Sequence, residues 1–362
     1  MKKKLIFFYP SFERGGATKI LIRVINYLLT KNIEISLFSC NASYKDFINS
    51  KKLIIKGSNI KNKSRLYFNL ITTVNLLKFL IRNNEEITIF SFQSHLPAIF
   101  LAKFFKKKII IRNSEEIFGA TRYADKKIYA LITLMLKIVF YNLADVIIAI
   151  SIKSKKSLEK IILNKKKIKL IYNPYLKNNK KFRVKNNNFF FNILCVGRLT
   201  KQKNFLLVIK AINELTQQYP HIQLTIIGSG PLKYDLVSVA NKNINFLNWT
   251  NNVKKYFLKS DLFILPSYYE GLPNALIDAA YYNIPSISTD CSGAKDILLN
   301  NKGGYIVPIN NLIELKKKIS IVIENYKDAK KKALVAKKNA SNYSILNCKK
   351  YHQLFLKGRI NH

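Results

Sequence analysis

Residues 266–278 read PSYYEGLPNALID and follow an apolar, strand-like run at 262–265. A strand, a turn rich in Gly and Pro and then a helical pattern predict a βα junction at the carboxyl edge of a parallel sheet. The first amides of a helix have no acceptor within the helix, so they can face an anion. We therefore expect Asn274, Ala275 and Leu276 to present free amides to a diphosphate.

The same stretch carries two carboxylates, Glu270 before the helix and Asp278 eight residues later. A spacing of eight keeps the second carboxylate near the helix face that the first one addresses. One acid can accept hydrogen bonds from a sugar and the other from a ribose diol. These two side chains are therefore candidate ligand contacts.

Working outward, a second junction follows the expected strand at 190–196. Gly197 and Arg198 come directly after it, with Lys201 and Lys203 before the next helical pattern. A glycine followed by cations at the carboxyl end of a strand suits the neutralisation of phosphate. A solvated basic loop in a lysine-rich chain is the other explanation.

Two more glycine pairs lie at strand ends. Gly228 and Gly230 follow the expected strand at 223–227, and Gly15 and Gly16 lie between the opening strand and a helix. Glycines there let a ligand approach the backbone and bring helix amides near an anion. Ordinary turn chemistry explains each pair equally well.

The whole chain alternates short β-branched runs with longer periodic segments, which predicts an α/β fold with parallel sheets. In the first half, strands are expected at 4–9, 33–39, 88–91, 108–112 and 146–151. Residues 173–188 are polar, basic and without period, so we interpret them as a linker. Two α/β halves joined in this way leave a cleft, which is the usual place for a ligand.

The composition is strongly basic. The 362 residues include 62 Lys and Arg against 20 Asp and Glu, a formal net charge of +42. Residues 1–183 contribute +27 and residues 184–362 contribute +15. Such an excess favours an anionic partner: nucleic acid, an acidic membrane or phosphorylated substrates. An A/T-rich genome would also raise Lys above Arg, so the charge alone does not choose among these.

Several protein classes are excluded. A hydrophobic content of 48% argues against a disordered chain, and four distant cysteines without a CxxC pair argue against a disulfide framework or a zinc site. The start lacks a cleavage pattern, and Lys137 and Asp145 interrupt the apolar stretch at 131–150. We therefore expect no signal peptide and no spanning helix, and a soluble or peripheral protein of the reducing cytoplasm.

These motifs together resemble the retaining GT-B glycosyltransferases of family 4. The resemblance rests on the two acids eight apart, on the spacing GR(x)4K from Gly197 to Lys203, and on IIGSGP at 226–231. It covers nearly the whole chain, and PNALIDAAYYNIPSISTD at 273–290 is its most specific part. That part is especially similar to bacterial enzymes that extend glycans on a polyprenyl diphosphate lipid.

The resemblance implies two Rossmann-like domains whose parallel sheets face a central cleft. Residues 1–172 would form the acceptor-side domain and residues 189–340 the nucleotide-sugar domain, with a helical tail at 341–362 packing back on the first. It also implies transfer of a hexose or N-acetylhexosamine from a UDP-sugar, with retention, to a lipid-linked glycan in cell-surface polysaccharide assembly. Neither a cofactor nor a metal is expected.

On the donor side, the resemblance assigns Arg198 and Lys203 to the diphosphate and Glu270 to the donor sugar as a catalytic residue. Asp278 would hold the ribose hydroxyls, although the family usually has the longer Glu there. Trp249 falls where the base normally packs, and Gly228 lines the donor site.

On the acceptor side, the resemblance places Gly15 and Gly16 in a loop near the donor phosphate and the acceptor. His95 lies where many relatives have an acceptor-site histidine, a candidate catalytic group, although a lone histidine is more often structural. Arg112 ends a strand at the same sheet edge and is a candidate contact for an acceptor phosphate.

An anionic membrane surface is the remaining expected partner. Lysine runs interleaved with apolar side chains predict shallow docking on lipid headgroups; they comprise 106–108, 153–156 and 165–169, with Phe100, Leu101, Phe104 and Phe105. A soluble GT-B enzyme that forms a small glycoside is the first alternative. A basic nucleic-acid-binding protein is the remote one, because no RNP, KH or helix-turn-helix pattern occurs.

Overall fold

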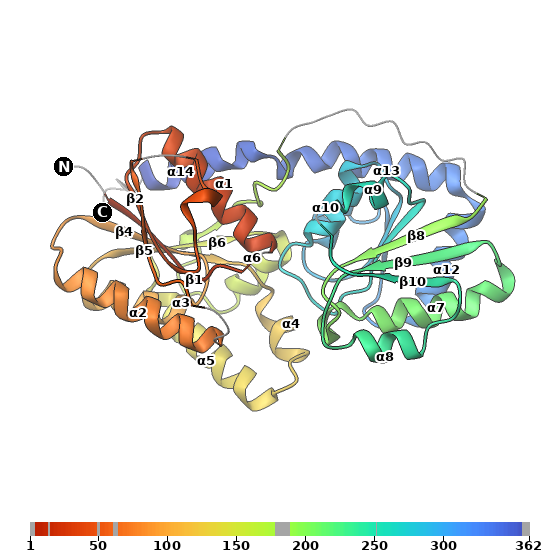
Figure 1. Ribbon diagram of the computed structural model, residues 1–362, viewed down its shortest axis with the longest axis horizontal. Coiled ribbons are helices and arrows are strands. Elements are labelled where there is room, and N and C mark those ends of the chain that lie inside the picture. The colour runs from red at the N-terminus through yellow and green to blue at the C-terminus, as the bar shows by residue number, and fades with distance from the viewer. Residues whose placement is uncertain are drawn as a thin grey trace. The chain divides into compact units, whose positions relative to one another are not determined.

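The computed structural model describes residues 4–13, 15–48, 51–60, 64–177, 189–250 and 252–356. These form two compact units (Figure 1). The first contains the chain up to Lys177 together with the segment from Tyr343 onward, and the second ends at Asn342. Each unit is an α/β sandwich around a parallel sheet, which is the fold class that the sequence predicts.

The first unit is built on a seven-stranded sheet in which every described pairing is parallel. In sheet order its strands are β3 (Leu53–Lys56), β2 (Ile35–Cys40), β1 (Lys4–Ser11), β4 (Ile87–Ser91), β5 (Lys108–Asn113), β6 (Val146–Ala149) and β7 (Ile168–Leu170). Successive side chains of a strand point to opposite faces. Accordingly Leu5 and Phe7 of β1 enter one core, whereas Ile6 and Phe8 enter the other.

Helices cover both faces of this sheet. On one face lie α1 (Gly16–Thr30) and α14 (Cys348–Leu356). On the other lie α2 (Arg65–Ile81), α3 (His95–Phe104), α5 (Lys127–Leu143) and α6 (Ile152–Glu159), with the short α4 (Ile117–Arg122) leading into α5 (Figure 1). The stretch at 131–150 therefore splits into a helix and a strand, as the sequence predicts.

The chain after Tyr343 packs on the first unit through backbone bonds to the segment that leaves it. The amides of Tyr175 and Leu176 both donate to the Tyr343 carbonyl at 2.8 Å, and Leu176 forms a parallel bridge with Ser344. Tyr351 of α14 is fully buried against the ring of Phe90. The segment leaving the first unit thus extends to Lys177, five residues beyond the expected boundary at 172.

The second unit has a six-stranded parallel sheet. Its order is β10 (Ile244–Leu247), β9 (Ile222–Ile227), β8 (Phe191–Val196), β11 (Leu262–Leu265), β12 (Ser286–Thr289) and β13 (Tyr305–Val307). One face carries α7 (Phe205–Gln218), α8 (Lys233–Ser238) and α12 (Leu312–Glu324). The other carries α9 (Lys254–Phe257), α10 (Asn274–Tyr281), α11 (Ala294–Leu298) and α13 (Tyr326–Ala340) (Figure 1).

Both sheets reverse their strand order at one point. In the first unit the order turns between β1 and β4, and in the second it turns between β8 and β11. The loops that follow these strands diverge to opposite faces, which leaves a crevice at the carboxyl edge where ligands bind in open α/β sheets. This topology selects the loops after β8 and β11 as the place to look for a site in the second unit.

Candidate functional site

The loops after β8 and β11 lie side by side in the second unit. The amide of Tyr268 donates to the Gln202 carbonyl at 2.9 Å, and the Gln202 side chain donates to the Tyr269 carbonyl at 3.0 Å. These two bonds fasten segments that are more than sixty residues apart in the chain. They hold Lys203 and Glu270 against each other.

Lys203 and Glu270 form an ion pair through Nζ and Oε1. The Ser267 hydroxyl donates to the same carboxylate oxygen at 2.8 Å. The lysine and glutamate side chains are only 17% and 10% exposed, so water screens the pair weakly. No bond within the described chain engages the second oxygen of Glu270, which leaves one acceptor oxygen for a ligand.

Cys291 lies near this pair but is not a nucleophile. Its side chain is fully buried, and burial raises the pKa of the thiol to about 12, with the negative charge of Glu270 acting in the same direction. The thiol is therefore protonated at neutral pH. The described residues also contain no group of three or more His, Cys, Asp or Glu arranged to hold a metal ion.

The glycines of IIGSGP serve the packing of two loops. The amide of Leu199 donates to the Ser229 carbonyl at 2.9 Å, and a Cβ on Gly228 would lie 1.8 Å from the Gly197 carbonyl oxygen. A side chain at Gly228 would therefore force these loops apart. The sequence predicts that this glycine makes room for a ligand, whereas neighbouring backbone fills the space.

Arg198 is exposed in the middle of this loop arrangement. Its guanidinium has no ion-pair or hydrogen-bond partner within the described chain. An unpaired guanidinium next to the Lys203 segment retains all of its donors for an anion.

The amino terminus of α10 departs from the expectation in one detail. Leu276 and Ile277 both donate their amides to the Pro273 carbonyl, at 3.1 and 3.2 Å. The prediction of three free amides is therefore wrong for Leu276, because the first turn tightens onto Pro273. Asn274 and Ala275 come before Leu276 in the chain, so their amides lie ahead of the first of these bonds. The buried Oδ1 of Asn274 has no hydrogen-bond partner within the described chain.

Asp278 is partly buried on α10 and lies beside Tyr282, one turn further along. Burial raises the pKa of Tyr282 to about 12, and the Asp278 carboxylate adds to the shift. Trp249 follows β10 and is 54% exposed. Since β10 is the edge strand, Trp249 belongs to the carboxyl edge of the sheet but not to the pair of loops at the reversal.

In the first unit, Gly15, Gly16 and His95 follow the two strands that flank the reversal. Gly15 is extended and caps α1, which begins at Gly16. His95 is the first residue of α3; its Nδ1 lies 2.8 Å from the Ser91 hydroxyl, and its ring packs edge-on against Tyr141. Burial and the positive charges of Lys137 and Arg112 lower the pKa of His95 to about 3, so the ring is neutral at physiological pH.

Arg112 does not lie on an open surface. It is 1% exposed, donates to the Asn173 side chain at 2.5 Å and lies 5.0 Å from the centre of the Phe92 ring. This burial argues against the expected contact with an acceptor phosphate. Arg112 instead joins β5 to the segment that leaves the first unit, although its Nε and Nη1 have no hydrogen-bond partner among the described residues.

Sequence reasoning missed Ser267 and Gln202. Ser267 fixes the carboxylate of Glu270, and Gln202 bridges the two loops. Both stand in the motifs that the sequence singled out, but serine and glutamine are common loop residues. Only the distance between the loops in space reveals their roles.

The comparisons with known proteins identify the family and the fold. The family model described as "Glycosyl transferases group 1" matches residues 177–342, a range that includes the whole second unit. An uncharacterized glycosyltransferase of Methanocaldococcus jannaschii is 30% identical over 279 residues, covering 70% of this chain and 68% of that protein. The chain belongs to the group 1 glycosyl transferases.

Two further similarities extend over almost the full length. A Campylobacter jejuni enzyme, described as a GalNAc-alpha-(1->4)-GalNAc-alpha-(1->3)-diNAcBac-PP-undecaprenol alpha-1,4-N-acetyl-D-galactosaminyltransferase, is 25% identical and covers 96% of both chains. Anabaena Alr3699/HepE, solved in complex with UDP-glucose, has a TM-score of 0.75 at 16% identity and covers 98% of this chain and 99% of that one. The fold is therefore GT-B, and the enzyme is a glycosyltransferase.

Within the described ranges, no helix combines the length and the apolar character that crossing a bilayer requires.

The Lys203–Glu270 pair predicts a characteristic double-mutant cycle. Lys203→Met leaves a poorly solvated carboxylate without its cation and is expected to lower the free energy of unfolding by up to about 3 kcal/mol. Adding Glu270→Gln should recover most of that loss, because no charge is then left unpaired. Urea unfolding of the single and double variants measures the coupling, and Lys210→Met, an exposed change on α7, is the control. Additive effects of the two substitutions would contradict the pairing.

His95 predicts a pH dependence of stability. The unfolded histidine binds a proton below about pH 6.5, whereas the folded one does so only near pH 3. The unfolded state therefore gains protons first, and acidification lowers the free energy of unfolding by up to about 1.4 kcal/mol per pH unit. Denaturant unfolding at several pH values measures how the free energy of unfolding changes with pH. This dependence should be shallower for His95→Gln than for the parent or for His221→Gln. Parallel slopes would contradict the buried neutral ring.

Proposed function

We propose that this glycosyltransferase moves a hexose or N-acetylhexosamine from a UDP-sugar to a glycan carried on a polyprenyl diphosphate, with retention of anomeric configuration and without a metal. The observation that carries the proposal is the Lys203–Glu270–Ser267 cluster beside the amino terminus of α10. The Campylobacter relative is described as acting on an undecaprenyl-linked glycan, and the Anabaena structure was solved with UDP-glucose. We infer a role in cell-surface polysaccharide assembly.

The donor diphosphate would be held by cations and amides. Lys203 has three donors and uses one on Glu270, so the others can reach a phosphate oxygen. Arg198 supplies an unpaired guanidinium, and Asn274 and Ala275 supply amides at a helix amino terminus. Such preorganised positive groups stabilise the charge that develops on the leaving diphosphate as the glycosidic bond breaks.

Glu270 would bind the sugar as a fixed acceptor. Lys203 and Ser267 hold one of its oxygens, and the other is available to the donor's hydroxyl groups. A double-displacement mechanism would require a carboxylate at the anomeric carbon. A carboxylate held by Lys203 and Ser267 is suited to position the sugar rather than to attack its anomeric carbon. The acceptor hydroxyl would then enter on the face from which the diphosphate leaves.

We propose the remaining donor contacts from the positions of three residues in the second unit. We assign the ribose hydroxyls to Asp278 and the base to the segment that contains Trp249, with Gly228 keeping the donor loops closed. The first unit would serve the acceptor through Gly15, Gly16 and His95. With its pKa lowered to about 3, His95 is a weak base and is better suited to orient an acceptor by hydrogen bonding.

We further propose that the enzyme works at the inner face of the cell membrane as a peripheral protein. Helix α5 supports this proposal: of its residues only Tyr141 is buried, and its outer surface exposes Ile128, Ile132, Met135 and Val139 by 79, 52, 59 and 61%. Phe100 and Phe104 on the neighbouring α3 are 57% and 71% exposed, whereas Leu101 is buried in the core. A contiguous exposed apolar surface marks an interaction site.

A donor and acceptor panel tests the proposed reaction. Purified enzyme is incubated with radiolabelled UDP-sugars and either polyprenyl-diphosphate-linked glycans or soluble sugars, with Glu270→Gln as the inactive control. We expect transfer of one UDP-sugar to the lipid-linked acceptor, with the α-linkage of the donor retained by NMR. Transfer to soluble sugars alone would favour an enzyme that makes small glycosides, and no transfer from any UDP-sugar would exclude the proposed donor.

Arg198 gives a sharper test of the diphosphate site. Arg198→Ala removes a charge-assisted partner worth about 1.5–3 kcal/mol, so kcat/KM for the donor should fall by about 10- to 150-fold. Lys210→Ala removes an exposed cation on α7 and should leave the donor kinetics unchanged. Equal kinetics for both variants would remove Arg198 from the site.

A further inference from the structure

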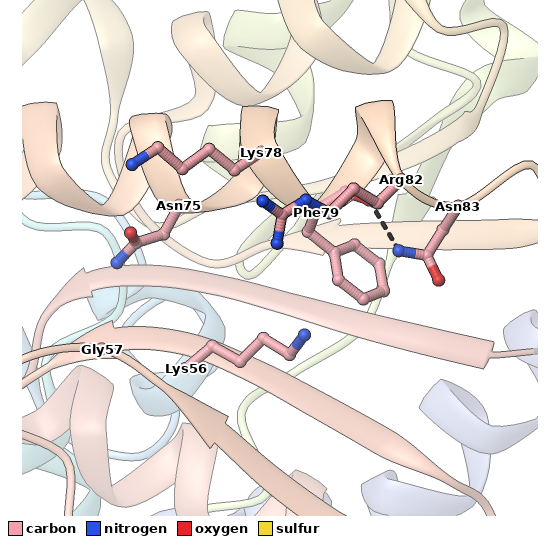
Figure 2. A pocket seen from close by; sticks show the side chains of 7 residues that line it. All are labelled: Lys56, Gly57, Asn75, Lys78, Phe79, Arg82 and Asn83. Carbon is pink, nitrogen blue, oxygen red and sulfur yellow. Dashed lines mark hydrogen bonds between the residues drawn. The ribbon is translucent and has the colours of Figure 1, made fainter.

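A basic pocket lies in the first unit at the edge strand β3, away from the strand reversal. It has a volume of about 330 Å³ and is bounded by the end of β3 and the carboxyl-terminal half of α2. Figure 2 shows Lys78 and Arg82 on the helix and Lys56 on the strand, with the Phe79 ring between them. The pocket is lined by three cations and no acid, and its volume lies in the range of small-molecule sites.

The charges in this pocket are not neutralised within the described chain. Lys56, Lys78 and Arg82 form no ion pair there. The Lys56 ammonium lies 4.1 Å from the centre of the Phe79 ring, and its pKa is lowered by burial and by the nearby charge of Lys4. Three cations that line one pocket without a counter-ion in the described chain favour a bound anion, since each would gain from a charge-assisted hydrogen bond.

The strand side of the pocket lies close to β2. A Cβ on Gly57 would lie 1.7 Å from the Ser39 carbonyl oxygen of β2, so only glycine lets the end of β3 approach its neighbouring strand this closely. The Asn83 side chain donates to the Phe79 carbonyl at 2.7 Å and closes the last turn of the helix (Figure 2). The pocket is thus bounded by the end of β3 on one side and by the last turns of α2 on the other.

The apolar surface of the same helix borders the pocket. Leu70, Val74 and Ile81 are exposed by 61, 37 and 64%, and Val74 and Ile81 lie one turn to either side of Lys78. Helix α2 contacts α3, and beyond the ends of the two helices Lys107 donates to the Glu85 carbonyl at 2.8 Å. A ligand phosphate in the pocket would therefore have apolar side chains next to it.

We propose that this pocket binds the phosphate of an anionic membrane lipid, while the exposed apolar side chains of α2 and α3 enter the bilayer surface. A lipid combines both features in one molecule, an anion joined to apolar chains, which a soluble phosphate does not. The inference rests on the proposed location at the membrane and not on the transfer chemistry. The pocket is separate from Arg198, Lys203 and Glu270 of the second unit.

Vesicle flotation tests the proposal with the full chain. The probes are vesicles of phosphatidylcholine alone and of phosphatidylcholine with phosphatidylglycerol. Lys78→Gln/Arg82→Gln removes two exposed pocket cations, and Lys317→Gln/Lys338→Gln removes two exposed cations from the second unit. At about 1 kcal/mol per cation near an anionic surface, the pocket variant should bind anionic vesicles about 30-fold more weakly than the parent. The control variant should bind like the parent.

A second arm distinguishes lipid from soluble phosphate. Leu70→Ser/Ile81→Ser keeps every cation and should weaken vesicle binding, and glycerol phosphate at millimolar concentration should not release the parent protein from anionic vesicles. Three results would overturn the proposal: equal binding by the two charge variants, equal recovery on neutral and anionic vesicles, or release by glycerol phosphate. Because Lys78→Gln/Arg82→Gln leaves the donor site intact, its transfer to a detergent-dispersed polyprenyl-diphosphate-linked glycan, measured without vesicles, separates failure of this inference from failure of the proposed reaction.

Discussion

The reversal of strand order in each sheet is the constraint on which the candidate site depends. In the second unit, the loops after β8 and β11 leave the sheet edge at this reversal and are then joined by Gln202. That junction brings Lys203 and Glu270 together as a weakly exposed ion pair. The chemistry follows from topology: a cation and an acid more than sixty residues apart become one unit at the carboxyl edge of a sheet.

Much of the fold could be predicted from the sequence, because parallel strands buried on both faces leave strong local signals. The apolar run at 131–150 separates correctly into α5 and β6, and the strands before Gly197 and before residue 266 end close to where the pattern predicts. The motif residues of the second unit also lie where strand ends should place them. Periodicity and turn chemistry are local properties, so one sequence suffices to read them.

What the sequence could not predict depends on distance in space. The sequence makes Arg112 a candidate contact for an acceptor phosphate, yet the packing around Asn173 and Phe92 buries it. It treats Leu276 as a free amide, yet the helix tightens on Pro273. Conversely, the sequence shows the stretch at 131–150 only as apolar, and most of the apolar side chains of α5 are exposed. A pattern identifies an apolar face but not whether another element of the chain covers it.

The four cysteines allow the unfolding of each unit to be measured separately. All four are buried and unpaired; Cys40 and Cys348 belong to the first unit, and Cys195 and Cys291 to the second. Burial raises the pKa of Cys348 and Cys291 to about 12 and that of Cys195 further. Because the thiolate is the reactive form, these thiols gain reactivity only when their unit opens. Alkylation followed by peptide mapping would therefore record the opening of the two units independently, with no label added to the protein.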